Sequence, residues 1–191
     1  MAAAAWGEVR LALAGSWQLA RGNRGGLACF DRSLDGFWRS FRAAVIAYPL
    51  YLLLLTMRVG IADWQAAGGL RIVTVETIAY VISWVAFPLV MLSVTRWLGR
   101  THHFFDFMVP YNWSQLPESA LFVLVGLGSE IGAPSAPAAE AIELGALIAV
   151  LVYEWYIARV ALDTTRSTAA LVVFVDLALG MLIDRISGSL Y

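Results

Sequence analysis

Long apolar segments recur along this chain, and they limit its possible folds more than any other feature. Residues 38–58, 74–96, 139–161 and 167–186 are each predominantly apolar. Each is about as long as the 20-residue helix that crosses the hydrocarbon core of a bilayer. Of the 191 residues, 60% are hydrophobic and 14% are charged, whereas a soluble domain is less apolar and more charged. We therefore expect an all-α fold, a polytopic membrane helix bundle.

A further candidate span begins near Phe105 and differs from the other four. Its first half is polar, and its apolar run, from Ala120 to Val125, is too short to cross a bilayer alone. The helix must carry polar residues at membrane depth, or begin as an interfacial segment and turn inward. Counting this helix, we predict about five transmembrane helices in a domain over residues 38–191, after a cytoplasmic or interfacial segment over residues 1–37.

The basic residues predict the orientation of the spans. All of them are Arg, which we interpret as the composition bias of a GC-rich bacterial genome. Ten of the thirteen fall before the first span or in alternate connections, and only Arg58, Arg71 and Arg185 fall on the other side. Basic residues concentrate on the cytoplasmic side of membrane proteins. We expect a multi-pass protein of the bacterial inner membrane, with its N-terminus cytoplasmic and its C-terminus periplasmic.

The segment before the first span contains two apolar stripes at helical spacing. Trp6, Val9, Leu13 and Trp17 form one, and a second begins at Phe30. We predict an N-terminal amphipathic helix in the inner interface, because such helices place aromatic rings in lipid and Arg among head groups. The alternative is a cytoplasmic cap packed on the bundle. The predicted membrane-interface residues are Trp6, Trp17, Phe30, Phe37, Trp38, Arg39 and Arg42.

Two acidic residues lie deep inside predicted spans. Asp176 lies near the centre of the fifth span, and Glu154 lies in the inner part of the fourth. A carboxylate at that depth is costly unless it is protonated, paired or hydrated, so both should face the bundle interior. Asp176 is either a proton or cation relay, or a neutral group that bonds a neighbouring helix.

The polar half of the third span offers a second set of candidates. Asn112, Gln115 and Glu118 lie near Pro110 and Pro117, and each proline frees a backbone carbonyl. Interrupted helices with polar side chains build the midplane sites of many transporters. The alternative is an inner belt of aromatic and amide groups. We hypothesise that Glu118, Glu154 and Asp176 converge on one polar pocket.

The sequence gives no sign of an enzyme, a cofactor or a nucleic-acid partner. It contains no nucleophile motif, no glycine-rich phosphate loop and no HExxH zinc motif. His102, His103 and Asp106 are interpreted as loop residues rather than metal ligands, because two groups at helical spacing are too few for a closed site. A net charge of −1 does not favour nucleic acid.

The outline of a cytoplasmic N-terminal segment and five closely linked spans resembles the Yip1 family. The stretches from Phe30 to Arg39 and from Pro110 to Trp113 are similar to those of small bacterial inner-membrane proteins. Eukaryotic Yip1 relatives act in membrane trafficking, a role that would not transfer to a bacterium. The resemblance therefore implies a topology and no activity.

Two classes of function remain. In the first, the chain is a structural or accessory protein that packs within a membrane complex or homo-oligomer. Eight Trp and several small residues in the spans favour this class. In the second, it is a small transporter or channel subunit that uses Asp176, Glu154 and Glu118 for proton- or cation-coupled movement of a solute. Both classes have the lipid bilayer as partner.

Overall fold

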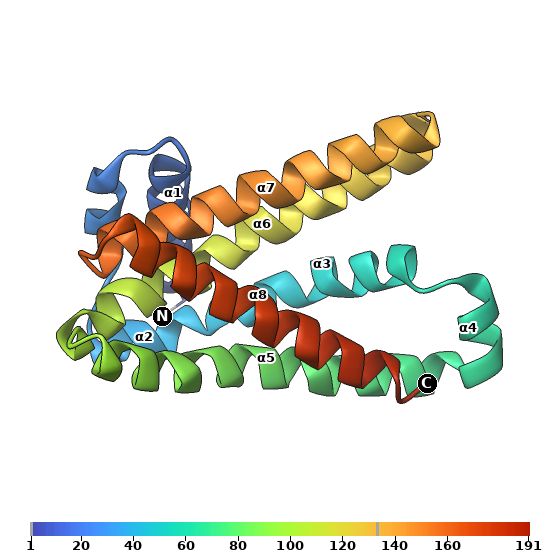
Figure 1. Cartoon of the computed structure of the whole chain (residues 1–191), viewed down its shortest axis with the longest axis horizontal. Coiled ribbons are helices and arrows are strands. Elements are labelled where there is room, and N and C mark those ends of the chain that lie inside the picture. The colour runs from blue at the N-terminus through green and yellow to red at the C-terminus, as the bar shows by residue number, and fades with distance from the viewer. Residues whose placement is uncertain (1, 133) are drawn as a thin grey trace.

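The computed structural model describes residues 2–132 and 134–191, and every regular element in this part is a helix (Figure 1). The all-α fold class is therefore confirmed. In chain order the elements are α1 (Ala2–Ala20), the 3₁₀ helix η1 (Arg24–Cys29), α2 (Leu34–Ser40), α3 (Arg42–Arg58), α4 (Ile61–Ala67), α5 (Gly69–Trp97), the 3₁₀ helix η2 (Thr101–His103), α6 (Phe104–Gly132), α7 (Ala136–Ala161) and α8 (Arg166–Gly188).

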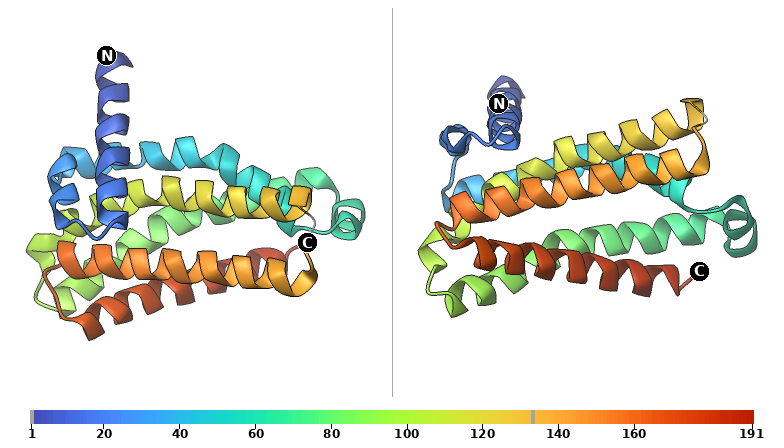
Figure 2. Two further views of the ribbon diagram at one scale, coloured as in Figure 1. Left: turned by 90° about the horizontal axis from the view of Figure 1, so that it is seen from above. Right: turned by 45° about the horizontal axis from the view of Figure 1, so that its top comes forward.

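Five long helices, α3, α5, α6, α7 and α8, run back and forth between two ends of the molecule (Figure 1). Each begins and ends within a few residues of an expected span. One end, here called the α1 end, holds α1, α2 and the connections that follow α5 and α7. The other, here called the α4 end, holds α4, the last turn of α6, the first turn of α7 and the C-terminus (Figures 1 and 2).

Three segments are long and apolar enough to cross a membrane by length and composition. They are Leu34–Arg58, which joins α2 and α3, and the helices α5 and α7. These three are compatible with a membrane protein. The remaining long helices, α6 and α8, are not among the three. The count of five spans is therefore a proposal.

Helix α6 is continuous over 29 residues, although Pro110 and Pro117 lie inside it. At 1.5 Å per residue it is about 43 Å long. It runs from the α1 end to the α4 end and does not turn back (Figure 1). A segment that dips into the bundle and returns is therefore excluded.

The core of the bundle is centred on the first half of α6. All side chains from Phe107 to Ser114 are buried, and α6 contacts α1, α2, α3, α5 and α7. Trp113 is the largest fully buried side chain among the described residues. The amide and hydroxyl groups in this half are therefore enclosed by other helices. This burial contradicts the alternative of an inner belt of aromatic and amide groups at the interface.

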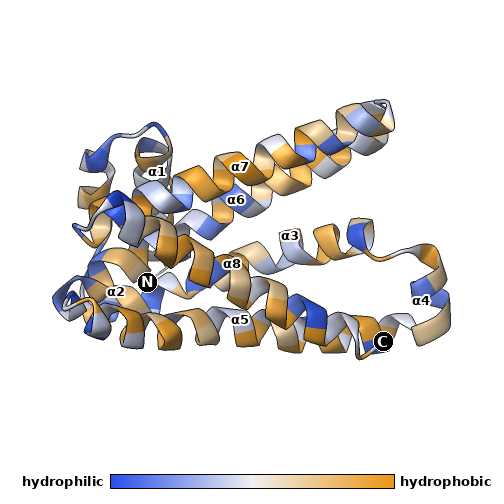
Figure 3. Cartoon of the chain, viewed as in Figure 1, coloured by the Kyte–Doolittle hydropathy of each residue, from blue (hydrophilic) through white to orange (hydrophobic). Residues whose placement is uncertain are grey.

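Apolar residues predominate along the long helices (Figure 3). Val45 on α3, Leu89 on α5, Val152 on α7 and Phe174 on α8 are all exposed. A soluble monomer rarely exposes such large contiguous apolar surfaces. The exposed apolar surface is typical of helices that are solvated by lipid.

Helix α1 crosses the α1 end roughly at right angles to the long helices (Figure 2). Val9, Ala12 and Leu19 on one of its faces belong to the same hydrophobic core as the bundle. Glu8 accepts hydrogen bonds at 2.9 Å from both Arg39 and Arg42, which fastens α1 to the start of the first long segment. The N-terminal segment therefore packs on the bundle through one face.

The predicted membrane-interface residues divide into two groups. Trp6, Trp17 and Trp38 are exposed, with Trp6 at 66%. Phe30 and Phe37, by contrast, are buried in the hydrophobic core, so the prediction that they face lipid is wrong for these two. Phe37 packs against Phe41 and Phe104, which shows that the second apolar stripe joins the N-terminal segment to α6.

Candidate ligand cavity

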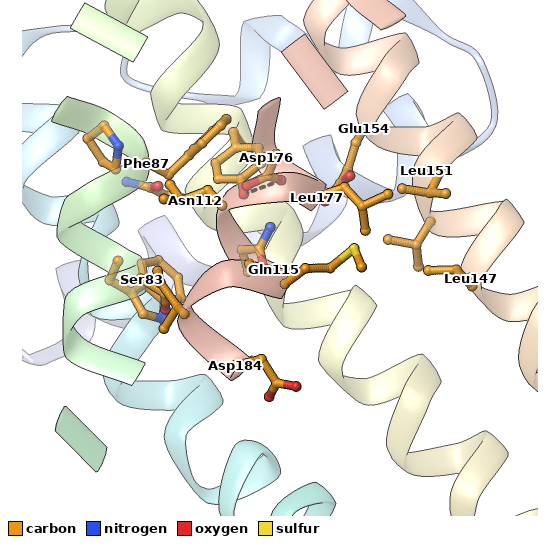
Figure 4. Close-up of a pocket in the computed structure, with 18 of the residues that line it drawn as sticks. Ser83, Phe87, Asn112, Gln115, Leu147, Leu151, Glu154, Asp176, Leu177 and Asp184 are labelled. Carbon is orange, nitrogen blue, oxygen red and sulfur yellow. Dashed lines mark hydrogen bonds between the residues drawn. The ribbon is translucent and has the colours of Figure 1, made fainter. Parts of the chain in front are cut away.

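A cavity of about 420 Å³ lies among α5, α6, α7 and α8 (Figure 4). Each helix turns one face toward it. On α7 the lining residues are Leu147, Val150, Leu151 and Glu154, which recur at the spacing of one helical face. The predicted residues Asn112, Gln115, Glu154 and Asp176 all line this cavity, although they come from three helices that are distant in sequence.

Asp176 is held in place by an aromatic side chain. The hydroxyl of Tyr111 donates a hydrogen bond of 2.7 Å to Oδ2 of Asp176, which joins α6 to α8 (Figure 4). The ring of Tyr111 packs on Phe87 of α5, with 4.5 Å between the ring centroids. The carboxylate of Asp176 therefore lies beside an aromatic wall of the cavity.

Glu154 lines the same cavity from α7 and is only 9% exposed. It lies within reach of Asp176 of α8 and Gln115 of α6, and no Arg or His in residues 2–132 and 134–191 is in ion-pair range of it. Gln115, on the facing side of α6, has a buried Nε2 atom without a hydrogen bond of ordinary geometry. The cavity thus contains polar groups with unused hydrogen-bonding capacity.

The side chains of Asn112 and Glu118 are less exposed than that of Glu154. Asn112 is 1% exposed and donates a hydrogen bond of 2.8 Å to Oγ of Ser40, so it also fixes α2 against α6. Glu118 lies one turn beyond Gln115 on α6, is 5% exposed, and has an Oε1 atom without a partner. It does not line the cavity, but it is close enough to Glu154 and Asp176 for the charges to interact.

The charged side chains that line the cavity are acidic. Among the lining residues that the structure describes there is no Arg or His, whereas Glu154, Asp176 and Asp184 are acidic. Asp184 pairs with Arg58 of α3. Within the described part of the chain, Glu118, Glu154 and Asp176 have no basic partner in ion-pair range. An uncompensated group of carboxyls in a low-dielectric region favours binding of a cation over an anion.

A second cavity of about 800 Å³ adjoins the first and lies toward the α4 end. It is bounded by α3, α6 and α7, and it shares Phe122 and Leu147 with the first cavity. Glu140 and Glu143 of α7 lie along its walls. At the opposite end of the bundle the core around Phe107 to Ser114 is closed. The second cavity therefore continues the acid-lined cavity toward the α4 end.

Glu76 of α5 was not among the residues singled out from the sequence. It is 1% exposed and pairs with Arg58 at 3.0 Å. It also accepts hydrogen bonds from Tyr51 of α3, from Ser187 of α8 at 3.0 Å and from Tyr191 at 2.9 Å. The sequence signal was its position between Val75 and Thr77, near one end of the expected span 74–96.

The histidine pair at the α1 end forms no metal site. His103 Nδ1 lies 2.8 Å from Asp106, and Asp106 also pairs with Arg32 at 3.0 Å. Within residues 2–132 and 134–191, no group of three or more His, Cys, Asp or Glu side chains is arranged to hold a metal ion.

Comparison with known proteins finds no match to this chain, whether among family models, curated proteins or solved structures. The resemblance to the Yip1 family therefore stays a prediction from topology.

Proposed function

We propose that this chain is an integral membrane protein of the transporter or channel-subunit class, which moves a cation through the acid-lined cavity. The single observation that supports it is the meeting of Asn112, Gln115, Glu154 and Asp176, from three helices, in one cavity without a basic lining residue. Intramembrane carboxyls that face a cavity mark ion pathways in many transporters.

The proposal includes five spans and a cytoplasmic N-terminus. Its support is the distribution of charge over the fold. The segments at the α1 end carry ten of the thirteen Arg residues, and the α4 end carries Arg58, Arg71 and Arg185. With the α1 end in the cytoplasm of a bacterial cell, this distribution obeys the positive-inside rule. The cavity then opens to the periplasm.

The shape of the cavity favours a carrier over an open channel. Its support is that a second cavity adjoins it toward the α4 end, whereas the half of α6 toward the α1 end is buried. A site that is open to one side corresponds to one state of an alternating-access cycle. The second state would open the α1 end and close the α4 end.

The test is cation flux in vesicles that contain the purified protein. Proton entry is followed with a trapped pH-sensitive dye, and sodium entry with a trapped sodium-sensitive dye, under a membrane potential that is negative inside. We expect the wild-type protein to carry protons, and Asp176→Asn to reduce the proton flux to that of empty vesicles; sodium entry is the comparison. Asp63→Asn, a matched change on exposed α4 outside the cavity, should retain it. Equal flux through both variants would contradict the proposal.

The accessory class is supported by a different observation. The 800 Å³ cavity between α3 and the α6–α7 pair is lined by Leu54, Leu55, Val125 and Leu144, and a helix of a second copy or a partner protein fits such an apolar groove. This class predicts a stoichiometric partner after purification in mild detergent, together with no flux in vesicles. A flux-competent protein without a partner excludes it.

A further inference from the structure

We infer that the cavity takes an organic monocation with an apolar or aromatic body, a quaternary or protonated amine, rather than a bare metal ion. This inference rests on the proposed function and names the substrate class of the same site. It is carried by the size of the cavity, its aromatic wall, the absence of a basic lining residue in the described part of the chain, and its exposed apolar flank.

The size and ligand arrangement argue against a bare ion. A cavity of about 420 Å³ is in the range that holds small organic ligands. A metal ion would need several oxygen ligands at about 2–2.6 Å around one point. No three acidic or metal-binding side chains in the described residues are grouped in that way. The space is therefore suited to a ligand that fills it with its own atoms.

The walls supply both attractions that an organic cation uses. Phe87, Tyr111 and Trp84 present aromatic rings from α5 and α6, and Tyr111 is hydrogen-bonded to Asp176. Glu154, nine-tenths buried and without a basic partner among the described residues, faces the same space from α7. Aromatic faces attract quaternary ammonium groups, and a nearby carboxylate adds a full opposite charge. No lining group offers the positive charge that an anion would need.

The cavity also has an apolar flank that reaches the outer surface. Leu147 of α7 and Leu177 and Met181 of α8 line the cavity and are themselves exposed, Met181 at 65%. In a bilayer this flank would be in contact with acyl chains. A cation with an apolar body that partitions into the membrane can therefore approach from the side, which a hydrated inorganic ion cannot do.

Benzyltrimethylammonium is the probe, because it combines a fixed positive charge with one aromatic ring. Binding is measured by titration calorimetry on the purified chain in lipid nanodiscs, with sodium benzenesulfonate as the aromatic anion and sodium chloride as the bare cation. We expect only benzyltrimethylammonium to bind. Binding of sodium alone, or equal binding of benzenesulfonate, would overturn the organic-cation assignment.

Three variants locate the site. Glu154→Gln and Asp176→Asn should each weaken benzyltrimethylammonium binding about tenfold or more, the loss of a close opposite charge. Phe87→Leu keeps an apolar side chain of somewhat smaller volume but removes an aromatic face, and should weaken benzyltrimethylammonium binding about fivefold. Asp63→Asn should bind as the wild type does. Unchanged affinity in Phe87→Leu would overturn the aromatic part, and unchanged affinity in both acid variants would overturn the site.

The two proposals fail in different ways. Proton or sodium flux that depends on Asp176, without benzyltrimethylammonium binding, keeps the proposed function and overturns the substrate class. Specific binding that is lost in Glu154→Gln, without any flux or any uptake of the probe into vesicles, keeps the site and overturns the transport function. A variant is included only if it elutes as one peak at the wild-type volume, so loss of folding is not counted as loss of binding.

Discussion

Gly36 has no room for a side chain. A Cβ atom added there would lie 1.8 Å from the carbonyl oxygen of Asp31, and the Gly36 amide donates to Oγ of Ser33, which caps α2. We expect Gly36→Ala to lower the free energy of unfolding by about 1–3 kcal/mol, the usual cost of overpacking. Thermal unfolding in detergent measures it. Gly128→Ala, where nothing lies within 4 Å of the added atom, is the control. Equal unfolding temperatures would contradict the close contact.

The same turn carries an acid-sensitive group. Hydrogen bonds from Ser33 lower the pKa of Asp31 below its ordinary value of 3.8, and Arg39 adds to the effect. A lowered pKa in the folded chain stabilises the fold above the unfolded-state value. This contribution is present at neutral pH and is lost as the pH falls through the folded-state pKa.

Individual side chains were only partly predictable from the sequence. Asp176 and Glu154 could be singled out because a carboxylate within an apolar helix has to face the interior. Glu76 could not be distinguished from a residue at a helix end, because its partners Arg58 and Ser187 come from other helices. Phe30 and Phe37 were predicted to face lipid, but they are buried in the protein core. An apolar stripe predicts that a face is buried, but not whether lipid or protein covers it.

At the scale of elements, Glu76 joins three helices near the α4 end. Arg58 of α3 pairs with Glu76 of α5 and Asp184 of α8, and Ser187 of α8 also donates to Glu76. We expect Glu76→Ala to destabilise the chain by about 1–3 kcal/mol, because it removes the buried acceptor of the hydrogen bonds from Tyr51, Ser187 and Tyr191. Arg58 contributes less to this cost, because its side chain is 46% exposed and it keeps Asp184 as a partner. Limited proteolysis should cut near the end of α8 in this variant and not in the wild type.

The matched control for this prediction is Glu140→Ala, a carboxylate on the exposed face of α7. It should change the unfolding temperature little. Where Glu76→Ala does not accumulate, Glu76→Gln keeps one acceptor oxygen and should unfold at an intermediate temperature. If both Glu76→Gln and Glu76→Ala were as stable as the wild type, the contacts of Glu76 would not be what keeps α8 in place.

Helix positions were predicted well and the role of α6 was not. Hydropathy located most of the long helices to within a few residues, because an apolar segment of about 20 residues usually forms a single long helix. The polar half of α6 suggested an interface or a broken helix. It is in fact the centre of the bundle, where Asn112 bonds Ser40 and Trp113 is fully buried. Composition along one helix does not reveal how many neighbours enclose it.

At the scale of the whole molecule, the proposed topology can be tested with single cysteines. In a Cys29→Ser background, Ser135→Cys reports the start of α7 and Asp163→Cys reports the connection after it. A membrane-impermeant maleimide should label Ser135→Cys in cells whose outer membrane alone is permeabilised. It should label Asp163→Cys only after the inner membrane is opened. The reverse result would invert the orientation, and labelling of both from outside would exclude α7 as a span.

The enclosed polar half of α6 has a consequence for how the chain is made. A segment with Asn112, Gln115 and Glu118 beside two prolines partitions poorly into lipid when it is alone. Its partners on α2, α3 and α5 all precede it in the chain. In the proposed topology, α6 enters the membrane beside α2, α3 and α5, before its other partner α7 has been synthesised. The order of the helices along the chain is thus also an order of assembly. Contacts with α3 and α5 are the first that stabilise the polar half of α6.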